Sequence, residues 1–139
     1  MYNTILFEKK NRKAYITLNR PETYNALSRE MLAELSRAVQ ECAEDEEVRV
    51  VILSGGNDKA FSSGADLKEG LADTRLGNVL KTTYNPLIMG LRGLKKPVIC
   101  RMNGLAAGAG MSLALACDVI IAAEEAYFTE LFVGIGLMP

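Results

Sequence analysis

Residues 97–117, PVICRMNGLAAGAGMSLALAC, decide the fold. A β-prone run at residues 98–102 ends at the turn Asn103-Gly104, and small residues then lead into a helix expected to end near Cys117. A strand that passes through a short loop into a helix is the repeating unit of layered α/β domains. The stretch therefore predicts one such unit, and the sequence on both sides of it predicts others.

The N-terminal side shows the same alternation. Strands are expected at residues 4–7 and 14–18, joined as a hairpin by the charged turn at residues 9–13. Ser28 is expected to cap a helix that runs to about Ala43, because apolar residues recur there at spacings of three and four. The β-branched run at residues 48–53 follows, and a flat apolar run after a helix is typical of a buried strand reached by a crossover.

The C-terminal side adds a helix and two strands. The helix is expected at about residues 78–94, with a kink or a late start because Pro86 lacks a backbone N–H. Residues 119–123 are expected to form a fully apolar strand, and Tyr127-Phe128 a short one. Alternating strands and helices predict an α/β fold with a mainly parallel central sheet, built as one domain over residues 1–139.

The composition excludes several classes of function. With 16 basic and 17 acidic residues the net charge is −1, so no overall field favours nucleic acid or an anionic membrane. Charged residues interrupt every apolar run before the roughly 18 residues of a membrane span. The chain has no histidine, which removes Ser-His and Cys-His pairs and imidazole metal ligands. Carboxylates are therefore the first candidates for proton transfer, and no metal site is expected.

The cysteines favour a reducing compartment. Cys42, Cys100 and Cys117 are an odd number, widely spaced, without a C-x-x-C pair. The N-terminus has no basic and apolar signal sequence. A cytoplasmic location is the expectation that fits both observations.

The first of two candidate loops is KAFSSGADL, residues 59–67. Gly64 and Ala65 leave room where a ligand oxygen could approach the backbone, and Asp66 could cap the turn that follows. From the spacing alone, a tight surface turn is the favoured explanation of the same residues.

The second candidate loop is NGLAAGAGMS, residues 103–112, which joins a strand to a helix. The first N–H groups of a helix lack intrahelical partners and favour an anion or a developing oxyanion. Close packing of the helix on the sheet also requires small residues. A dinucleotide fingerprint is a third interpretation of Gly108-x-Gly110, but Leu113 stands at the third glycine and Glu130 only loosely fits the acidic position.

Taken together, the loops resemble those of the enoyl-CoA hydratase/isomerase (crotonase) family. The matching segments, in order, are ITLNRPETYNAL, VRVVILSGGNDKAFSSGADLKE, KKPVICRMNGLAAGAGMSLALACDVIIAAEEAYF and VGIGLMP. The resemblance implies a crotonase-like coiled ββα superhelix, present here as an N-terminal portion that lacks the C-terminal helical region. It also implies an enzyme of acyl-CoA thioesters that needs no cofactor, since coenzyme A is part of the substrate. A full-length form is expected to be a homotrimer or a dimer of trimers.

The resemblance further assigns roles to individual residues. Ala65 and Ala109 are expected to donate the two N–H groups of an oxyanion hole around the thioester oxygen. One such donor is typically worth roughly 3 kcal/mol to the transition state. The substrate and its coenzyme A portion are expected at Ala26, Leu27, Ser63, Ala65, Asp66, Leu67 and Gly110.

The sequence departs from the hydratase pattern at the acid–base positions. Ser112 stands at the first glutamate position and Phe132 at the second, which disfavours water addition by paired carboxylates. Glu130 is the carboxylate near the second position and a candidate base, although a surface role is weighed above it. The tail TELFVGIGLMP instead resembles ring-opening epoxide or double-bond isomerases of phenylacetyl-type acyl-CoA breakdown, in which an aspartate follows the equivalent of Pro139.

Four functions remain compatible with the sequence. Double-bond or epoxide isomerisation of an acyl-CoA, in fatty-acid or phenylacetate breakdown, ranks first, and hydration of an enoyl-CoA ranks second. A noncatalytic acyl-CoA-binding piece is third. A nucleotide-binding module is fourth, because it rests on Gly108-x-Gly110 alone.

Overall fold

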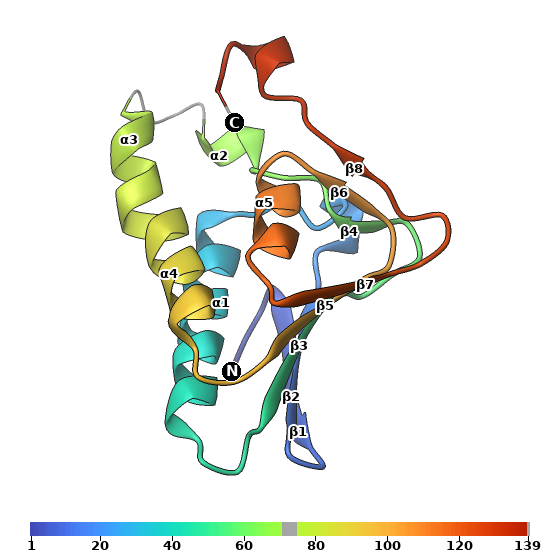
Figure 1. Cartoon of the computed structure of the whole chain (residues 1–139). Helices are drawn as coiled ribbons and strands as arrows, with labels where there is room; N and C mark the ends of the chain where they lie inside the picture. Colours follow the sequence, from blue (N-terminus) through green and yellow to red (C-terminus); the bar gives the residue numbers. More distant parts are fainter. Residues whose placement is uncertain (71–74, 139) are drawn as a thin grey trace.

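A five-stranded, mainly parallel sheet forms the centre of the molecule, as the sequence predicts (Figure 1). The computed structural model describes residues 1–70 and 75–138, so Pro139 lies outside the described residues. The strand order is β1-β2-β3-β5-β7; β1 pairs antiparallel with β2, and every other pair is parallel. The strands are β1 Ile5–Lys10, β2 Lys13–Leu18, β3 Val50–Gly55, β5 Val98–Met102 and β7 Val119–Ala122.

A second, smaller sheet has three parallel strands in the order β4-β6-β8. They are β4 Ala60–Ser62, β6 Leu105–Ala107 and β8 Phe128–Thr129. Each follows a strand of the large sheet, so the chain passes repeatedly from one sheet to the other. Strands β4 and β6 were not predicted, because strands of three residues are too short to show a period of two.

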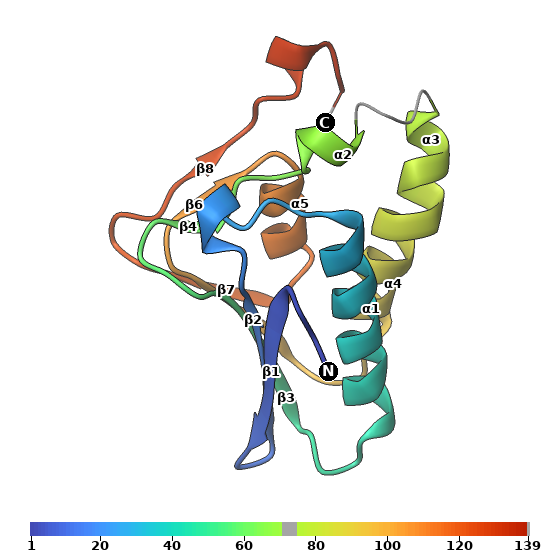
Figure 2. The same cartoon turned by 180° about the vertical axis from the view of Figure 1, so that it is seen from behind.

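The helices pack on one side of the large sheet, and α1 lies beside α4 (Figures 1 and 2). Their bounds are α1 Arg29–Glu44, α2 Leu67–Gly70, α3 Leu76–Val79, α4 Asn85–Gly93 and α5 Ala109–Leu115, with a π-helical turn at Leu80–Tyr84 and 3-10 turns at Pro21–Thr23 and Val133–Ile135. The late start considered at Pro86 is wrong, because the backbone is helical without a break from Leu76 to Gly93. The irregularity lies just before the proline, in the π-helical turn, where Asn85 N donates to Leu80 O.

Helix α1 matches the prediction closely, because the capping residue and the spacing of the apolar residues both indicate the same helix. The Ser28 side chain accepts a hydrogen bond from Met31 N at 3.1 Å, which satisfies one of the free amides of the first turn. The expected apolar stripe is buried, and burying a side chain such as Leu35 is worth about 1.5–3 kcal/mol. The buried apolar residues of the helix are Met31, Leu32, Leu35, Ala38, Val39 and Cys42.

Glu34 interrupts that stripe and is buried too. It accepts hydrogen bonds from Asn3 N at 2.7 Å, from Thr4 N at 2.8 Å and from the Thr4 hydroxyl at 2.5 Å. Burial alone would raise the Glu34 pKa, but these hydrogen bonds and the nearby Arg37 charge together lower it. The carboxylate thus fastens the segment before β1 to α1.

The hairpin has a tighter turn than the expected five residues. Asn11 and Arg12 alone connect β1 to β2, with φ values of 51° and 62°. Two consecutive residues of positive φ match the strand twist of a two-residue hairpin. The strands are therefore longer than predicted.

The apolar strand predicted at residues 119–123 forms as β7, but much of it is exposed. Val119 is 51% exposed and Ile121 is 60% exposed. The strand is the last in the sheet order, and the described residues do not cover it. Periodicity reports the apolar character of a strand, whereas its burial depends on what packs against it.

The three cysteines are all buried, and each comes from a different part of the chain. Cys42 lies on α1, Cys100 on β5 and Cys117 just after α5, and all three belong to the hydrophobic core.

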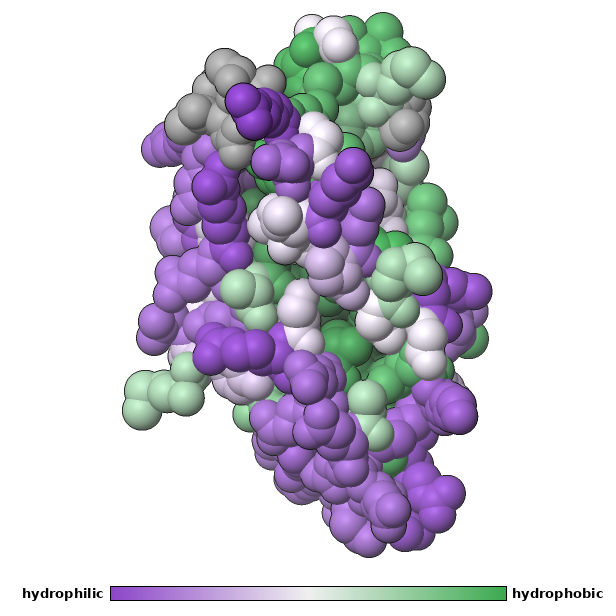
Figure 3. All heavy atoms as spheres, turned by 90° about the vertical axis from the view of Figure 1, so that its left-hand side faces the viewer, coloured by the Kyte–Doolittle hydropathy of each residue, from purple (hydrophilic) through white to green (hydrophobic). Residues whose placement is uncertain are grey.

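The surface on the side of α1, α3 and α4 is mostly hydrophilic in its lower part, with hydrophobic residues gathered at its upper end (Figure 3).

Candidate functional site: two facing loops

Neighbouring strands β4 and β6 bring the two predicted loops together. A Cβ atom on Gly64 would lie 2.7 Å from Ala107 O and 3.5 Å from Ala109 N. The first distance leaves no room for a side chain, and Gly64 also has a φ of 101°. Glycine is required here both for space and for backbone conformation, so the loops approach each other through bare backbone.

Ala65 has an N–H group that points away from its partner strand. Leu27 N donates to Gly64 O at 2.8 Å, and Asp66 N donates to Leu27 O at 3.2 Å. In an extended chain, neighbouring residues direct their backbone groups to opposite sides, so the Ala65 N–H faces away from Leu27. Among the described residues it has no hydrogen-bond acceptor.

Ala109 presents a second amide at the start of α5. Its neighbour Gly108 donates to Thr129 O at 3.0 Å, and the Ser112 N–H closes the first helical turn on Gly108 O at 3.1 Å. The Ala109 N–H has no acceptor in the part of the chain that the structure describes, as is usual in a first turn.

The two amides belong to the same small region of the structure. A nitrogen three bonds from a Cβ is at most about 3.8 Å away, so Ala65 N and Ala109 N are within about 7 Å of each other. An oxygen that accepts from two N–H groups lies about 3 Å from each nitrogen. Two free donors that converge on one such oxygen can stabilise the negative charge that develops on it.

Gly110 has a packing role. A Cβ on Gly110 would lie 2.5 Å from Ser62 O and 2.8 Å from Ser62 Cβ, because α5 crosses closely over β4. The close helix–sheet packing considered from the sequence therefore explains this glycine. Gly108, with a φ of 49°, instead borders the aromatic ring of Phe132, whose Cζ would lie 3.6 Å from a Cβ there.

The expected coenzyme A residues come from two segments that lie against each other. Ser63 N donates to Tyr24 O at 2.8 Å, and its hydroxyl donates to Thr23 O at 2.9 Å. The isolated Leu27–Ala65 bridge continues this contact. Ala26 and Leu27 are buried, Ser63 and Asp66 are half-buried, and Ala65 and Leu67 are exposed.

Two polar residues that were not predicted from the sequence, Asn25 and Arg20, hold these segments together. Asn25 is fully buried; its amide donates to Phe61 O at 3.1 Å and accepts from Arg20 N at 2.9 Å. The Arg20 side chain donates to Asp66 at 2.9 Å. Both residues lie in the motif NRPETYNAL, and an asparagine just before a buried apolar pair is the signal that could have identified the first.

The acid–base candidates lie at the edge of the two loops. Glu130 is exposed directly after β8, and Ser112 is exposed with its hydroxyl 3.5 Å from Gly108 O. Tyr84 is partly buried and packs against the hydrophobic core. Burial and then the charges of Asp66 and Glu69 raise the Tyr84 pKa to about 12, so this phenol keeps its proton at neutral pH.

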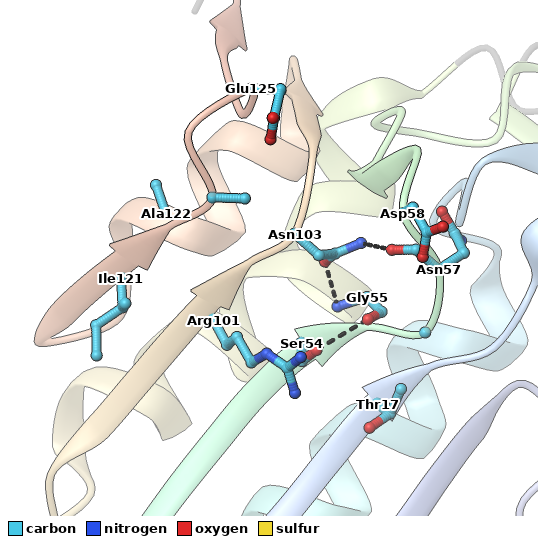
Figure 4. A pocket seen from close by; sticks show the side chains of 12 residues that line it. Thr17, Ser54, Gly55, Asn57, Asp58, Arg101, Asn103, Ile121, Ala122 and Glu125 are labelled. Carbon is cyan, nitrogen blue, oxygen red and sulfur yellow. Dashed lines mark hydrogen bonds between the residues drawn. The ribbon is translucent and has the colours of Figure 1, made fainter.

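A separate pocket of about 650 Å³ lies at the carboxyl ends of the large sheet's strands (Figure 4). Two of its polar side chains already serve the backbone: Asn103 accepts from Gly55 N at 2.9 Å and donates to Ala60 O at 2.9 Å, and the Ser54 hydroxyl donates to Gly55 O at 2.8 Å. None of its lining residues belongs to loop segments 63–67 or 108–110. We therefore regard the two facing loops as the better candidate site.

Metal clusters and membrane spans are both missing from residues 1–70 and 75–138. No group of three or more potential metal ligands is found there. No helix in those residues has the length and apolar character needed to cross a membrane.

The fold and the site define an α/β protein in which the chain winds between two sheets and exposes two unpaired amides. The sequence profile described as Enoyl-CoA hydratase/isomerase matches residues 8–139. The chain belongs to the enoyl-CoA hydratase/isomerase family, as the resemblance implied.

Curated relatives carry the names of two reactions. A probable enoyl-CoA hydratase of Rhodobacter capsulatus is 45% identical over 139 residues, which cover 99% of this chain and 53% of that protein. A 1,2-epoxyphenylacetyl-CoA isomerase of Escherichia coli is 41% identical over 129 residues, covering 89% of this chain and 49% of that protein. The chain thus spans about half the length of the curated relatives it matches.

Solved structures of the family confirm the fold class. A crystal structure of an enoyl-CoA hydratase/isomerase from Xanthobacter autotrophicus has a TM-score of 0.90 at 37% identity, covering 98% of this chain and 52% of that one. An enoyl-CoA hydratase/carnithine racemase from Magnetospirillum magneticum has a TM-score of 0.93 at 29% identity, covering 100% and 53%. The predicted crotonase-like fold, as the N-terminal portion of the length found in relatives, is therefore confirmed.

Proposed function

We propose that the chain binds an acyl-CoA thioester and stabilises its enolate with the N–H groups of Ala65 and Ala109. The observation that carries this proposal is the pair of unpaired amides on loops held together at Gly64, with 3.5 Å between the Gly64 Cβ position and Ala109 N. A proton next to a thioester carbonyl becomes removable when the developing oxyanion meets preorganised donors. Membership of the enoyl-CoA hydratase/isomerase family supports a thioester as the substrate class.

For the reaction, we favour isomerisation of a double bond or an epoxide. Water addition by the hydratase route uses two carboxylates, whereas shifting a double bond needs one group that removes a proton and returns it elsewhere. Ser112 and Phe132 stand at the two glutamate positions, and the Phe132 ring lies beside Gly108. Glu130 remains the candidate base within this chain. The 41% identity to a protein named 1,2-epoxyphenylacetyl-CoA isomerase also supports this choice.

Hydration of an enoyl-CoA is the second candidate. The relative that is 45% identical is named a probable enoyl-CoA hydratase, and one that is 38% identical is named a short-chain-enoyl-CoA hydratase. Noncatalytic binding of an acyl-CoA is the third candidate, since the chain spans about half the length of these relatives. A cytoplasmic location, a homotrimeric full-length form and the absence of a cofactor stay predictions.

Calorimetry with crotonyl-CoA and with NAD tests the substrate class. We expect heat of binding with crotonyl-CoA and none with NAD. Binding of NAD alone would overturn the proposal in favour of a nucleotide-binding module.

Incubation with a 3-enoyl-CoA and a 2-enoyl-CoA separates the reactions. Migration of the double bond is expected for an isomerase, and water uptake for a hydratase. Rapid hydration without migration would place hydration ahead of isomerisation, and binding without either reaction would favour the noncatalytic candidate.

A further inference from the structure

Arg20 joins the two segments that flank the Ala65 amide. One guanidinium nitrogen, Nη1, donates to Ala26 O at 2.7 Å and to Asp66 Oδ2 at 2.9 Å. The Arg20 side chain is 19% exposed and that of Asp66 is 9% exposed, so water screens this ion pair only partly. A second carboxylate, on Glu22, is 4.0 Å from Arg20 and 67% exposed, and it competes weakly.

The atoms that Arg20 holds lie on either side of the Leu27–Ala65 bridge. Ala26 O precedes Leu27 in one segment, and the Asp66 carboxylate follows Ala65 in the other. The bridge itself has only two hydrogen bonds, one of them at 3.2 Å. A charged contact across such a short pairing limits how far residues 64–66 can rotate.

Both ends of this contact are fixed in turn. Arg20 N donates to Asn25 Oδ1 at 2.9 Å, and Arg20 O accepts from Asn25 N at 2.9 Å. Asp66 Oδ1 accepts from Lys68 N at 3.1 Å. Farther along the loop, Glu69 accepts from Arg29 N at 2.7 Å and fastens α2 to the start of α1.

We propose that Arg20 is a positioning residue that sets the direction of the Ala65 N–H through Asp66. This inference rests on the proposed oxyanion role of that N–H. A donor stabilises an oxyanion only if it is already aimed at the place where charge develops, and small misplacements weaken the effect strongly. In this role Arg20 acts through Asp66, to which it donates at 2.9 Å.

The test compares two coenzyme A derivatives that differ at one oxygen. Butyryl-CoA carries the thioester carbonyl, and S-butyl-CoA has a methylene group in its place. The ratio of their dissociation constants reports the two amides and cancels contacts to the rest of coenzyme A. For two hydrogen bonds the wild-type chain is expected to prefer the thioester about thirtyfold.

Arg20→Gln is expected to lower that preference to about fivefold, because the Ala65 N–H would no longer point at the thioester oxygen. Asp66→Asn should lower the preference for the thioester similarly. This variant provides the test if Arg20→Gln does not fold. Arg20→Lys keeps a cation near Asp66 and is expected to restore most of the preference. Arg12→Gln is the matched control, since Arg12 is exposed and its nearest carboxylate, on Glu47, is 3.9 Å away.

The outcomes separate this inference from the proposed function. A wild-type chain that binds both compounds equally would overturn the oxyanion role, and the positioning role with it. A wild-type preference that persists in Arg20→Gln and Asp66→Asn would overturn the positioning role alone. Equal weakening of both compounds in these variants would also overturn it, since loss of folding or of coenzyme A contacts acts on both.

Discussion

Gly110 illustrates how one missing side chain sets the distance between α5 and β4. A Cβ there would lie 2.5 Å from Ser62 O, and both Gly110 and Ser62 are buried. We expect Gly110→Ala to lower the free energy of unfolding by about 1–3 kcal/mol, because neither backbone can move away cheaply. Urea denaturation followed by circular dichroism measures the change.

Gly93→Ala is the matched control for that prediction. Gly93 is the last residue of α4, and a Cβ there would meet nothing within 4 Å. The substitution should change stability little or raise it by up to about 1 kcal/mol, since alanine favours a helix. Equal effects of both substitutions would contradict the packing explanation for Gly110.

For single residues, the sequence could predict the important positions, but it could not predict whether each one serves packing or ligand binding. The small residues of both loops were identified from spacing, but packing and ligand binding demand the same residue types. The structure separates them: Gly110 is pressed against Ser62, whereas Ala65 and Ala109 keep unpaired amides. The Arg20–Asp66 contact joins positions 46 residues apart, which no local pattern reveals.

The contact between α1 and the start of β1 depends on a buried carboxylate. The hydrogen bonds to Glu34 lower its pKa in the folded chain, so folding favours the charged form. Its contribution to stability is therefore fully present above the unfolded pKa of about 4.3 and is lost as the pH falls through the folded value. We expect Glu34→Gln to cost about 1–3 kcal/mol at neutral pH, and progressively less in acid.

Chemical denaturation of wild type and variant between neutral pH and pH 3 measures that difference. Glu44→Gln is the control, because Glu44 is exposed on α1 and, within residues 1–70 and 75–138, its side chain has one hydrogen bond, from Gln40 at 3.0 Å. Surface changes of this kind fall within about 0.5 kcal/mol. A difference for Glu34→Gln that did not shrink in acid would argue against a charged Glu34 in the folded chain.

Long elements could be predicted from the sequence, and short ones could not. Helix α1 and strands β3 and β5 carry enough residues for period and capping to be recognised. Strands β4 and β6 have three residues each, yet they carry the two candidate loops. Their place depends on pairing with each other rather than on their own composition.

For the molecule as a whole, β7 is an exposed apolar edge. An edge strand offers unpaired backbone groups to another chain, and Val119 and Ile121 add apolar surface to it. We expect this chain to self-associate as its concentration rises, and Ile121→Lys to reduce the association. Sedimentation velocity over a range of concentrations measures both.

Leu6→Lys is the comparison for that experiment. Leu6 is also an exposed apolar residue on an edge strand, but it lies on β1 at the opposite edge of the sheet. Association through β7 should be unaffected by this change. Equal suppression by both variants would indicate nonspecific attraction between apolar surfaces.

The three buried thiols allow local opening of the chain to be followed by cysteine alkylation. A thiol reagent can reach Cys42, Cys100 or Cys117 only after the helix, sheet or turn around it has opened. Burial raises the Cys42 pKa to about 11, so alkylation of the closed state should be negligible. Mass spectrometry of each labelled peptide then times the opening of three regions without introducing a probe, and regions that open together would acquire their labels at one common rate.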